Sequence, residues 1–316
     1  MTEFDLIDLF TRAAPRSGEG VRVGIGDDAA VLRPPSGEEL VMTVDAVVED
    51  VHFDRRFRAE DVGWKALAVN LSDLAAMGAR PLWALCALAT PRRESPARIA
   101  AVGRGLAACA QAFGVALAGG NVTRARELAL TVTVVGAARR GEALQRAGAR
   151  PGDALLVSGT LGDAALGRRP GASRELVARQ RRPVPRLALG RALLGIAHAA
   201  IDVSDGLLQD LGHLCEASRV GAAVRVDALP LSPAYRRSSQ RLAPGRAYDA
   251  ALAGGEDYEL LVAVPPRRER RARDVARKVG IPLTAIGVVT RGGGLKVMDA
   301  HGRPYAVRAR GHDHLA

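Results

Sequence analysis

The sequence predicts an α/β protein of two domains. Segments with apolar residues at helical spacing alternate with short runs rich in valine, leucine and alanine, a pattern typical of helices packed on a sheet. At 316 residues the chain exceeds the usual size of one domain. A stretch rich in arginine, glycine and proline, residues 139–153, interrupts the alternation. We therefore expect an N-terminal domain over 1–138 and a C-terminal domain over 139–316.

Three helices and four strands are predicted in the N-terminal domain. Apolar residues at helical spacing predict helices over 3–13, 59–77 and 95–113. The second helix ends before Gly78 and Pro81, because neither residue favours its continuation. Runs that are rich in apolar residues, or that alternate with polar ones, predict strands over 40–48, 82–89, 115–118 and 127–135.

The C-terminal domain continues the alternation. Strands are predicted over 154–157, 223–226, 259–264, 286–289 and 295–298, and a further short strand leads into Asp202. Helices are predicted over 186–198, 206–217 and 267–279. The arginine- and proline-rich segment 168–185 is expected to be an exposed loop or an irregular helix.

The chain is strongly basic, with a formal net charge of +11. Of its 45 basic residues only three are lysines, and the arginines are spread over the whole chain. Aromatic residues make up 3% of the chain, and no nucleic-acid recognition motif accompanies the charge. We therefore do not expect a nucleic-acid partner, although the charge favours small phosphorylated ligands.

Cysteines and apolar runs indicate the cellular setting. Cys86, Cys109 and Cys215 lie far apart within apolar or helical patterns, without the spacing of a zinc site or a dithiol. We expect buried, reduced thiols. No apolar run reaches the roughly 18 residues that cross a bilayer, and the first residues are acidic where a secretory signal is basic. We expect a cytoplasmic protein without a membrane partner.

Five short carboxylate motifs lie in apolar segments that glycines interrupt. They are Gly24–Asp28, Thr43–Asp45, Asn70–Asp73, Asp202–Gly206 and Gly254–Asp257. Acids beside apolar runs are costly to bury unless a cation neutralises them. Lysines are scarce, and most arginines lie in polar stretches away from these motifs. A divalent metal is therefore the natural partner.

Each motif taken alone also has a structural explanation. Asn70 and Asp73 share one helix face, which is either a ligand site or a solvated polar surface. The glycines of the first motif allow a tight turn, either exposed or close to a ligand. Ser204 or Asp205 could simply cap the following helix. That leaves Asp202 at the end of a strand, next to a helix N-terminus that favours phosphate.

Two familiar kinds of site are not found in the sequence. No Gly-x-x-x-x-Gly-Lys-Ser/Thr segment occurs, which excludes an ATP site of the Walker type. No Ser-His-Asp or Cys-His arrangement has a persuasive local context. Of the six histidines, only His52 lies beside an acid motif in the first half of the chain.

Taken together, the motifs resemble those of the thiamine-monophosphate kinase family, within the aminoimidazole ribonucleotide synthetase superfamily. The resemblance covers nearly the whole chain, and its most specific part is the fifteen-residue block Lys65–Ala79. It implies a two-domain aminoimidazole ribonucleotide synthetase-like fold of the α/β (α+β) class. In that fold the N-terminal domain binds ATP and magnesium, and its sheet joins that of a dimer mate in a shared barrel. The C-terminal α/β domain completes the active site.

The resemblance also implies an activity, the ATP-dependent phosphorylation of thiamine monophosphate to thiamine diphosphate, by a homodimer with several magnesium ions. Matching motif positions imply magnesium ligands at Asp28, Thr43, Asp45, Asp73, Asn121, Asp202 and Asp205. They imply ATP contacts at Gly120, Asn121, Arg146 and Ser204. They imply contacts with thiamine monophosphate at His52, Glu256 and His312.

The physical chemistry agrees with this activity. The acceptor is a phosphate whose second pKa of about 6 leaves it mostly dianionic at neutral pH. It needs no general base, so no catalytic residue of that kind is expected. The obstacle is repulsion between two polyanions, which magnesium overcomes by alignment and charge neutralisation. We expect direct in-line transfer.

Three positions depart from the family pattern. Asn121 stands where the family has aspartate, and its amide oxygen can coordinate a metal without adding charge. Val44 replaces a hydroxyl residue, and His312 stands where an aromatic ring packs on thiamine. We expect weaker metal or substrate affinity rather than loss of activity.

Two alternatives stay open at this point. One is a sister ATP-dependent enzyme of the superfamily, such as selenophosphate synthetase or a hydrogenase-maturation ATPase. Those chemistries use a reactive cysteine or selenocysteine near the N-terminus, or a cysteine at the C-terminus, whereas the first cysteine here is Cys86 and the chain ends in His314-Leu315-Ala316. The other is a nucleotide-binding relative with reduced turnover.

Overall fold

The computed structural model describes residues 3–240, 242 and 245–307. The chain forms two compact units, and each contains its own main sheet. The first unit comprises Met1–Leu74 and Ala79–Gly141, and the second comprises Ala75–Gly78 and Glu142–Ala316.

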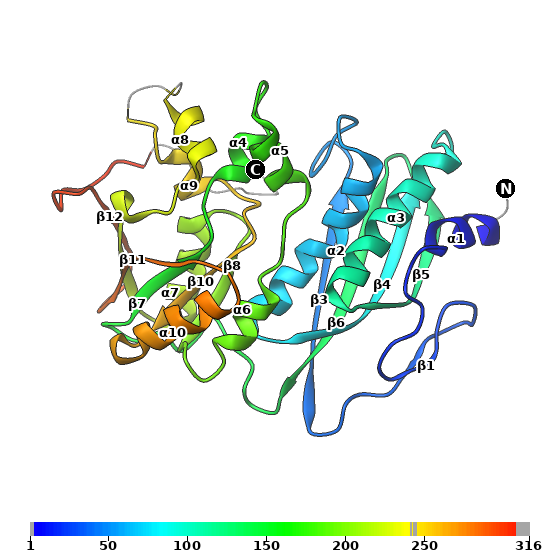
Figure 1. The fold of residues 1–316 in the computed structure, drawn as a ribbon, viewed down its shortest axis with the longest axis horizontal. Helices are drawn as coiled ribbons and strands as arrows, with labels where there is room; N and C mark the ends of the chain where they lie inside the picture. The colour runs from blue at the N-terminus through cyan, green and yellow to red at the C-terminus, as the bar shows by residue number, and fades with distance from the viewer. Residues whose placement is uncertain (1–2, 241, 243–244, 308–316) are drawn as a thin grey trace. The chain divides into compact units, whose positions relative to one another are not determined.

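The first unit is a four-stranded sheet with helices over one face (Figure 1). Its strands, in spatial order, are β3 (Glu38–Val48), β6 (Ala129–Arg139), β4 (Arg80–Thr90) and β5 (Ala116–Arg124). β3, β6 and β4 pair antiparallel, whereas β4 and β5 pair in parallel. The helices are α1 (Glu3–Thr11), α2 (Ala59–Ala76) and α3 (Pro96–Phe113). Two short strands, β1 (Val21–Val23) and β2 (Val31–Leu32), form a separate antiparallel pair.

Local sequence signals explain where α3 begins and ends. The side chain of Ser95 accepts a hydrogen bond from the backbone N–H of Arg98 at 3.2 Å, and Pro96 occupies the first turn. Gly114 ends the helix in the left-handed conformation, with φ 69°. These signals place α3 within the predicted span.

α2 and α3 approach each other backbone to backbone. A Cβ atom at Gly63 would lie 1.9 Å from the carbonyl oxygen of Val102, and one at Gly105 would lie 1.9 Å from that of Glu60. Only glycine fits at such positions. Figure 1 shows the two helices side by side over the sheet. This contact holds α2 in a defined place within the first unit.

The side chains of β3 point alternately toward the helix-covered face of the sheet and toward an exposed apolar face. Thr43 points toward α2, where it contacts Asp73. Side chains alternate between the two faces of a strand, so Met42 and Val44 point away from α2. Both are well exposed, at 63% and 59%, and Leu40 on the same face is 43% exposed. The first unit therefore exposes a row of apolar side chains on this strand.

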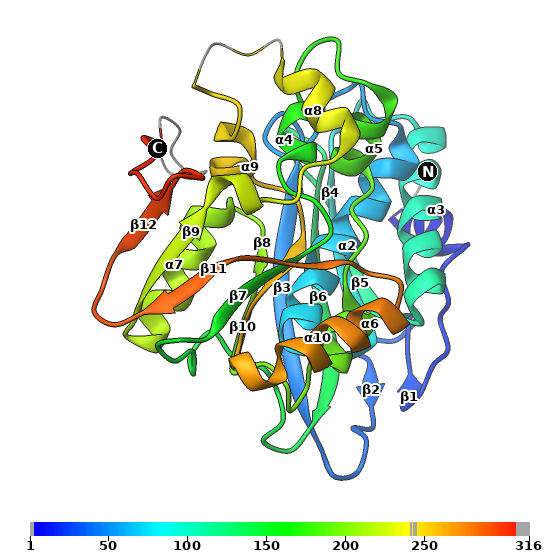
Figure 2. The ribbon, with the colours of Figure 1, turned by 60° about the vertical axis from the view of Figure 1, so that its left-hand side comes forward.

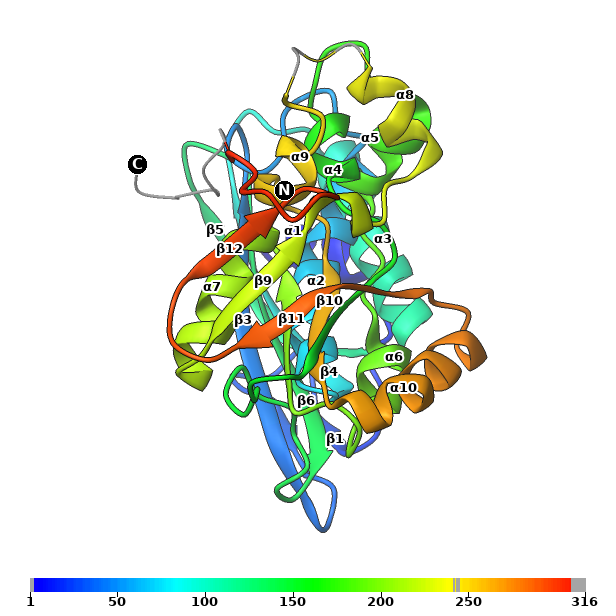
Figure 3. The ribbon, with the colours of Figure 1, turned by 90° about the vertical axis from the view of Figure 1, so that its left-hand side faces the viewer.

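The second unit is built on a six-stranded mixed sheet. In spatial order its strands are β12 (Leu295–Met298), β9 (Gly221–Arg225), β11 (Leu283–Thr290), β7 (Ala154–Ser158), β10 (Glu259–Val264) and β8 (Ala199–Val203). Neighbouring strands pair antiparallel, except that β12 and β9 are parallel. Figure 3 shows β12, β9 and β11 side by side. β8 and β10 are buried along their whole length.

The helices of the second unit include both long and very short ones. The longer ones are α5 (Arg174–Arg181), α7 (Leu207–Ser218) and α10 (Pro266–Lys278). The shorter ones are α4 (Asp163–Gly167), α6 (Leu187–Ala192), α8 (Pro233–Ser239), α9 (Asp249–Ala253) and the 3-10 helix η1 (Val226–Ala228). Figure 2 shows α4, α5, α8 and α9 grouped at one end of this unit.

Some predicted elements of the second unit differ from the observed ones. The helix predicted over 186–198 is too long, because α6 ends at Ala192 and the chain then turns through Gly195 at φ 68°. The segment 168–185, expected as a loop or irregular helix, contains the regular helix α5. The side chain of Ser173 caps that helix.

β5 is also longer than predicted. The strand predicted over 115–118 was expected to end at Gly119-Gly120-Asn121, but β5 continues to Arg124. The glycines indicated an end to the strand. In the structure, a Cβ atom at Gly120 would lie 2.0 Å from the carbonyl oxygen of Cys86, so glycine instead permits a close approach of two strands.

The expectation for the cysteines is confirmed. Cys86, Cys109 and Cys215 are buried, and none of these three residues takes part in a disulfide. In the part of the chain that the structure describes, none of the helices combines the length and apolarity needed to cross a membrane.

Candidate active site

The first part of the candidate site joins β3 to α2. Oγ1 of Thr43 donates a hydrogen bond to Oδ2 of Asp73 at 2.6 Å. α2 presents Asp73 here because Leu71 and Leu74, on either side of it, are fully buried in the core. Asn70 is also fully buried, and its Nδ2 donates to the carbonyl oxygen one turn earlier at 3.0 Å. The explanation of this helix face as a solvated polar surface is therefore wrong for Asn70. Thr43 and Asp73, two predicted metal ligands, are in direct contact.

The sheet register places two further predicted residues in one row. Asp45 of β3 pairs with Val132 of β6, and Val132 pairs with Cys86 of β4. Cys86 in turn pairs with Gly120 of β5. Asp45 and Gly120 thus lie at the same level on opposite edges of the sheet, three strand spacings or about 14 Å apart. Asp45 is a predicted magnesium ligand and Gly120 is a predicted ATP contact, so the predicted site must extend across the width of this sheet.

The other predicted residues of the first unit lie in a turn, an edge strand and a loop. Asp28 is exposed, and its N–H donates to Oδ1 of the preceding Asp27 at 2.8 Å. Asn121 is exposed on β5. His52 is half-buried, and its carbonyl oxygen accepts a hydrogen bond from Nζ of the buried Lys65 at 3.1 Å. α2 therefore anchors the His52 loop as well as presenting Asp73.

In the second unit, a buried aspartate organises the loop that precedes α7. Oδ2 of Asp210 accepts hydrogen bonds from the backbone N–H groups of Ser204, Asp205 and Gly206, at 3.0, 3.1 and 3.2 Å. Gly206 is the N-cap residue of α7, and no side chain caps the helix there. The capping explanation for Ser204 and Asp205 is therefore wrong.

Sequence reasoning missed Asp210. Burial, followed by the charge of Asp205, raises the pKa of Asp210 to about 7, while the three backbone N–H groups favour its charged form. The available signal was an aspartate in the first turn of the helix, four residues after Gly206.

The Glu256 loop is hydrogen-bonded to the same strand end. The N–H of Glu256 donates to the carbonyl oxygen of Ser204 at 2.7 Å. The N–H of Tyr258 donates to that of Val203 at 2.8 Å. Glu256 and Tyr258 have φ values of 71° and 51°, a left-handed backbone that side chains rarely adopt. Such strained positions are typical of functional loops.

Glu259, next to this loop, is fully buried and neutralised by two arginines. Its Oε1 accepts a hydrogen bond from Nη2 of Arg179 at 2.6 Å, and its Oε2 accepts one from Nε of Arg186 at 2.7 Å. Oγ of Ser158 also donates to Oε2, at 2.5 Å. Burial alone would raise the pKa of Glu259, but the hydrogen bond and charge of Arg186, then the charge of Arg179, hold it below its ordinary value.

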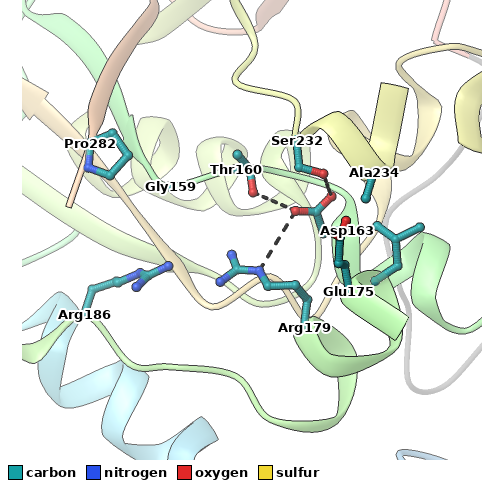
Figure 4. A pocket seen from close by; sticks show the side chains of 10 residues that line it. Gly159, Thr160, Asp163, Glu175, Arg179, Arg186, Ser232, Ala234 and Pro282 are labelled. Atoms are coloured by element: carbon teal, nitrogen blue, oxygen red, sulfur yellow. Dashed lines mark hydrogen bonds and ion pairs between the residues drawn. The ribbon is translucent and has the colours of Figure 1, made fainter. Parts of the chain in front are cut away.

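The same arginines line a pocket of about 310 Å³ within the second unit (Figure 4). Asp163 accepts hydrogen bonds there from Thr160 at 2.7 Å and Ser232 at 2.6 Å, and it pairs with Arg179 at 4.0 Å. Figure 4 shows Arg186 reaching toward Arg179 from the other side. None of the predicted site residues is among the described residues that line this pocket, and its polar groups largely bond one another.

Asp257 has a structural role between these two regions. Its Oδ2 accepts a hydrogen bond from the N–H of Gly162 at 2.6 Å, at the start of α4. Burial raises the pKa of Asp257 well above its ordinary value, although that hydrogen bond and the charge of Arg179 lower it. Asp257 therefore links the Glu256 loop to the start of α4 by a hydrogen bond.

The remaining predicted residues have varied surroundings. Arg146 is exposed, and its carbonyl oxygen accepts a hydrogen bond from Oγ of Ser218 at 2.9 Å. Asp202 is buried on β8, where it pairs with Leu260 of β10. His312 lies outside the described residues.

The predicted ligands fit Mg²⁺ by chemical type, since carboxylate, hydroxyl and amide oxygens are the hard ligands that this ion prefers. The contact between Thr43 and Asp73 brings two of them together. Within the described ranges, no three His, Cys, Asp or Glu side chains are grouped closely enough to hold a metal ion. Thr43 and Asp73 are therefore two predicted ligands in contact, outside any such group of three in the described ranges.

Comparisons with known proteins define the class. The N-terminal domain of AIR synthase related proteins matches residues 26–138, and their C-terminal domain matches residues 150–300. The protein thus has the two-domain α/β fold, with mixed sheets, of AIR synthase related proteins.

Similar proteins are thiamine-monophosphate kinases. The chain is 42% identical to thiamine-monophosphate kinase of Salmonella typhimurium, over 99% of this chain and 98% of that protein. The crystal structure of thiamine-monophosphate kinase from Stenotrophomonas maltophilia shares 44% identity, with a TM-score of 0.86 and coverage of 97% and 98%. AaThiL complexed with AMPPCP and TMP is 32% identical, with a TM-score of 0.78 and coverage of 99% and 96%. Likeness to E. coli HypE, at 22% identity, reflects the fold alone.

The chain therefore belongs to the thiamine-monophosphate kinase family.

Proposed function

We propose that the protein transfers the terminal phosphate of ATP to thiamine monophosphate, forming thiamine diphosphate. The observation that carries this proposal is the full-length similarity to thiamine-monophosphate kinases, one of which has been solved with AMPPCP and TMP. ATP is the co-substrate. The loop around Ser204 and Glu256 supplies polar groups in the second unit, and the Thr43–Asp73 pair supplies them in the first.

Each domain has a part in the proposed site. The N-terminal domain, residues 1–138, holds ATP and magnesium and forms the dimer, and residues 139–316 complete the active site. The proposed magnesium ligands are Asp28, Thr43, Asp45, Asp73, Asn121, Asp202 and Asp205. The proposed ATP contacts are Gly120, Asn121, Arg146 and Ser204, and those with thiamine monophosphate are His52, Glu256 and His312.

Magnesium, when bound, would neutralise charge between the two phosphates. The residues of this chain orient the reactants. Thr43 fixes the direction of the Asp73 carboxylate by its hydrogen bond. The backbone hydrogen bond between Glu256 and Ser204 holds the loop proposed to bind thiamine monophosphate next to the loop proposed to bind ATP. No general base is needed, because the acceptor phosphate is already mostly dianionic at neutral pH. Transfer is direct and in line.

The separation of Asp45 and Asn121 supports more than one magnesium ion. These two proposed ligands lie on β3 and β5, the opposite edges of the sheet, one residue apart in register and three strand spacings, or about 14 Å, across the sheet. An ion that holds its ligands at about 2.1 Å would not reach both side chains.

The open apolar face of the first unit supports a homodimer. Leu40, Met42 and Val44 are exposed in a row on β3, and Leu85 of β4 is also exposed. β3 is an edge strand of the sheet. Exposed apolar patches on sheets mark interfaces, and edge strands favour pairing with another chain. A second copy of this sheet would cover the face, forming the shared barrel.

One assay tests the proposal. Purified protein is incubated with ATP, magnesium and thiamine monophosphate, and thiamine diphosphate is measured. Asp45→Asn should reduce turnover, because an amide adds no charge. Asp227→Asn, at an exposed acid paired with Arg225, serves as the control and should leave turnover unchanged.

Other outcomes would contradict parts of the proposal. Absence of thiamine diphosphate with the wild-type protein would refute the kinase activity. ATP binding or hydrolysis without that product would instead indicate a sister ATP-dependent enzyme or a relative with reduced turnover. A phosphorylated form of the protein trapped during turnover would rule out direct transfer.

A further inference from the structure

The loop before α7 has the geometry of an anion-binding nest. Three successive backbone N–H groups, from Ser204, Asp205 and Gly206, converge on one oxygen atom. Such a row of N–H groups ahead of a helix is suited to a phosphate. In this protein the oxygen belongs to the carboxylate of Asp210, which is 3% exposed. The nest is therefore already filled by the chain itself.

This arrangement changes what the loop can offer to a ligand. The backbone donors that would bind a phosphate at this helix N-terminus are already bonded to Asp210. The other polar groups of this loop are the side chains of Ser204 and Asp205, both half-buried, and Nε2 of Gln209 donates a hydrogen bond to Oδ2 of Asp205 at 3.4 Å. Contact with ATP through a hydroxyl group, and with metal through a carboxylate, fits these side chains.

The same loop also determines where the Glu256 loop lies. The carbonyl oxygen of Ser204 accepts the hydrogen bond from the N–H of Glu256. A Cβ atom at Gly255 would lie 2.5 Å from that carbonyl oxygen, and one at Gly206 would lie 2.9 Å from the backbone of Ala253. The two loops are thus in backbone contact, and a shift of one must move the other.

We propose that Asp210 is a positioning residue for both loops: by filling the nest, its carboxylate directs the side chains of Ser204 and Asp205 toward the ligands and holds the backbone of Glu256. This inference rests on the proposed kinase function. In this role Asp210 acts through the three N–H groups that it binds rather than through contact with a substrate.

The test combines hydrogen exchange with kinetics. In Asp210→Ala, exchange of the amides of residues 204–206 should be at least about tenfold faster, because charge-assisted hydrogen bonds are lost. The KM values for ATP and for thiamine monophosphate should both rise about tenfold, because both loops relax together. Asp210→Asn, whose amide oxygen still accepts hydrogen bonds, should lie between the wild type and the alanine variant. It also provides a second variant if the alanine protein does not fold.

Asp153→Ala is the matched control. Asp153 is also 3% exposed, and it accepts a hydrogen bond from the N–H of Arg150 at 2.8 Å, outside both loops. This variant should lose thermal stability without a change in either KM or in exchange of residues 204–206. Equal losses of stability in both alanine variants, with unchanged KM values and unchanged exchange, would overturn the inference.

The design separates the inference from the kinase function. If the wild-type protein forms no thiamine diphosphate, the proposed function fails, and the exchange measurement still tests the nest. If the wild-type protein is active and Asp210→Ala matches it in KM and exchange, the kinase function stands and the positioning role fails.

Discussion

Thr43 and Asp73 lie thirty residues apart in the sequence, and a 2.6 Å hydrogen bond joins their side chains. The bond connects the edge strand β3 to helix α2. This helix packs closely against α3, through Gly63 of α2 and Gly105 of α3. Because the helix is fixed, the carboxylate of Asp73 has a fixed direction as well. This pair is the best-assembled part of the proposed magnesium site in the first unit.

Thr43→Val removes the hydroxyl group and keeps the shape of the side chain. A hydrogen bond to a charged group contributes about 1.5–3 kcal/mol, so the magnesium concentration at half-maximal rate should rise about tenfold or more. Thr43→Ser keeps the hydroxyl and should stay close to the wild type. Initial rates over a magnesium series, at saturating ATP, provide the measurement. The same magnesium dependence in the valine and serine variants would show that the hydroxyl has no part in binding.

Asn121→Asp restores a charge on β5. A carboxylate binds Mg²⁺ more strongly than an amide does, so half-maximal activity should need several-fold less magnesium. Asn121→Ala is the comparison, because it removes the amide oxygen and should move the requirement in the opposite direction. A magnesium dependence that stays unchanged in both variants would show that residue 121 is not a ligand.

Gly120→Ala should impair both folding stability and ATP use. The added Cβ would lie 2.0 Å from the carbonyl oxygen of Cys86, so β5 must move away from β4. We expect a loss of about 1–3 kcal/mol in the free energy of unfolding, as for other overpacked sites, and a higher KM for ATP. Gly293→Ala is the control, because a Cβ there meets nothing within 4 Å. Equal stability of the two variants, measured by denaturant unfolding, would contradict the prediction.

Glu259→Gln tests the buried ion cluster of the second unit. Removing the charge leaves Arg186 without its buried partner and Arg179 with only the longer contact to Asp163 at 4.0 Å, and we expect a loss of about 3–5 kcal/mol in the free energy of unfolding at pH 7. Glu175→Gln, in an exposed pair with Arg237, should cost less than about 1 kcal/mol. Thermal or denaturant unfolding provides the comparison.

The same variant has a predicted pH dependence. The folded-state pKa of Glu259 lies below its ordinary value of 4.5. Its contribution to stability is therefore fully present above the unfolded-state pKa and is lost as the pH falls through the folded-state pKa. The stability difference between the wild type and Glu259→Gln should shrink in this acidic range. A difference that stays constant from pH 7 to about pH 3 would refute this account.

Met42→Glu tests the proposed dimer. A charge in the middle of the apolar β3 face should prevent a second sheet from covering it, because a buried unpaired charge is costly. We expect a homodimer for the wild type and a monomer for the variant, by sedimentation or light scattering. Val184→Glu, at an exposed apolar residue of the second unit, should leave the dimer intact. A monomeric wild type would contradict the proposed interface.

Elements with strong local signals could be predicted from the sequence. Strand β10 coincides with the predicted 259–264, because a run of apolar residues is bounded by a glycine-containing loop and a proline. α3 could be placed through Ser95 and Pro96. The helices α4 and α9 were not predicted, because five residues are too few to show a helical period.

The geometry of the site was harder to predict. The row that aligns Asp45 with Gly120 depends on the pairing register of four strands, which no local pattern contains. The role of Asp210 depends on the helix turning its carboxylate back to the preceding loop. The motifs themselves could be recognised in the sequence, but the hydrogen bonds of Asp210 to the loop before α7 could not.

The glycine contact between α2 and α3 limits how the active site can evolve. Any side chain at Gly63 or Gly105 would collide with the backbone of the neighbouring helix, so a substitution at either position must force the two helices apart. Because α2 carries Asp73, that movement would also shift the carboxylate that Thr43 contacts. The small size of Gly63 and Gly105 therefore limits which sequences can keep the proposed site in place.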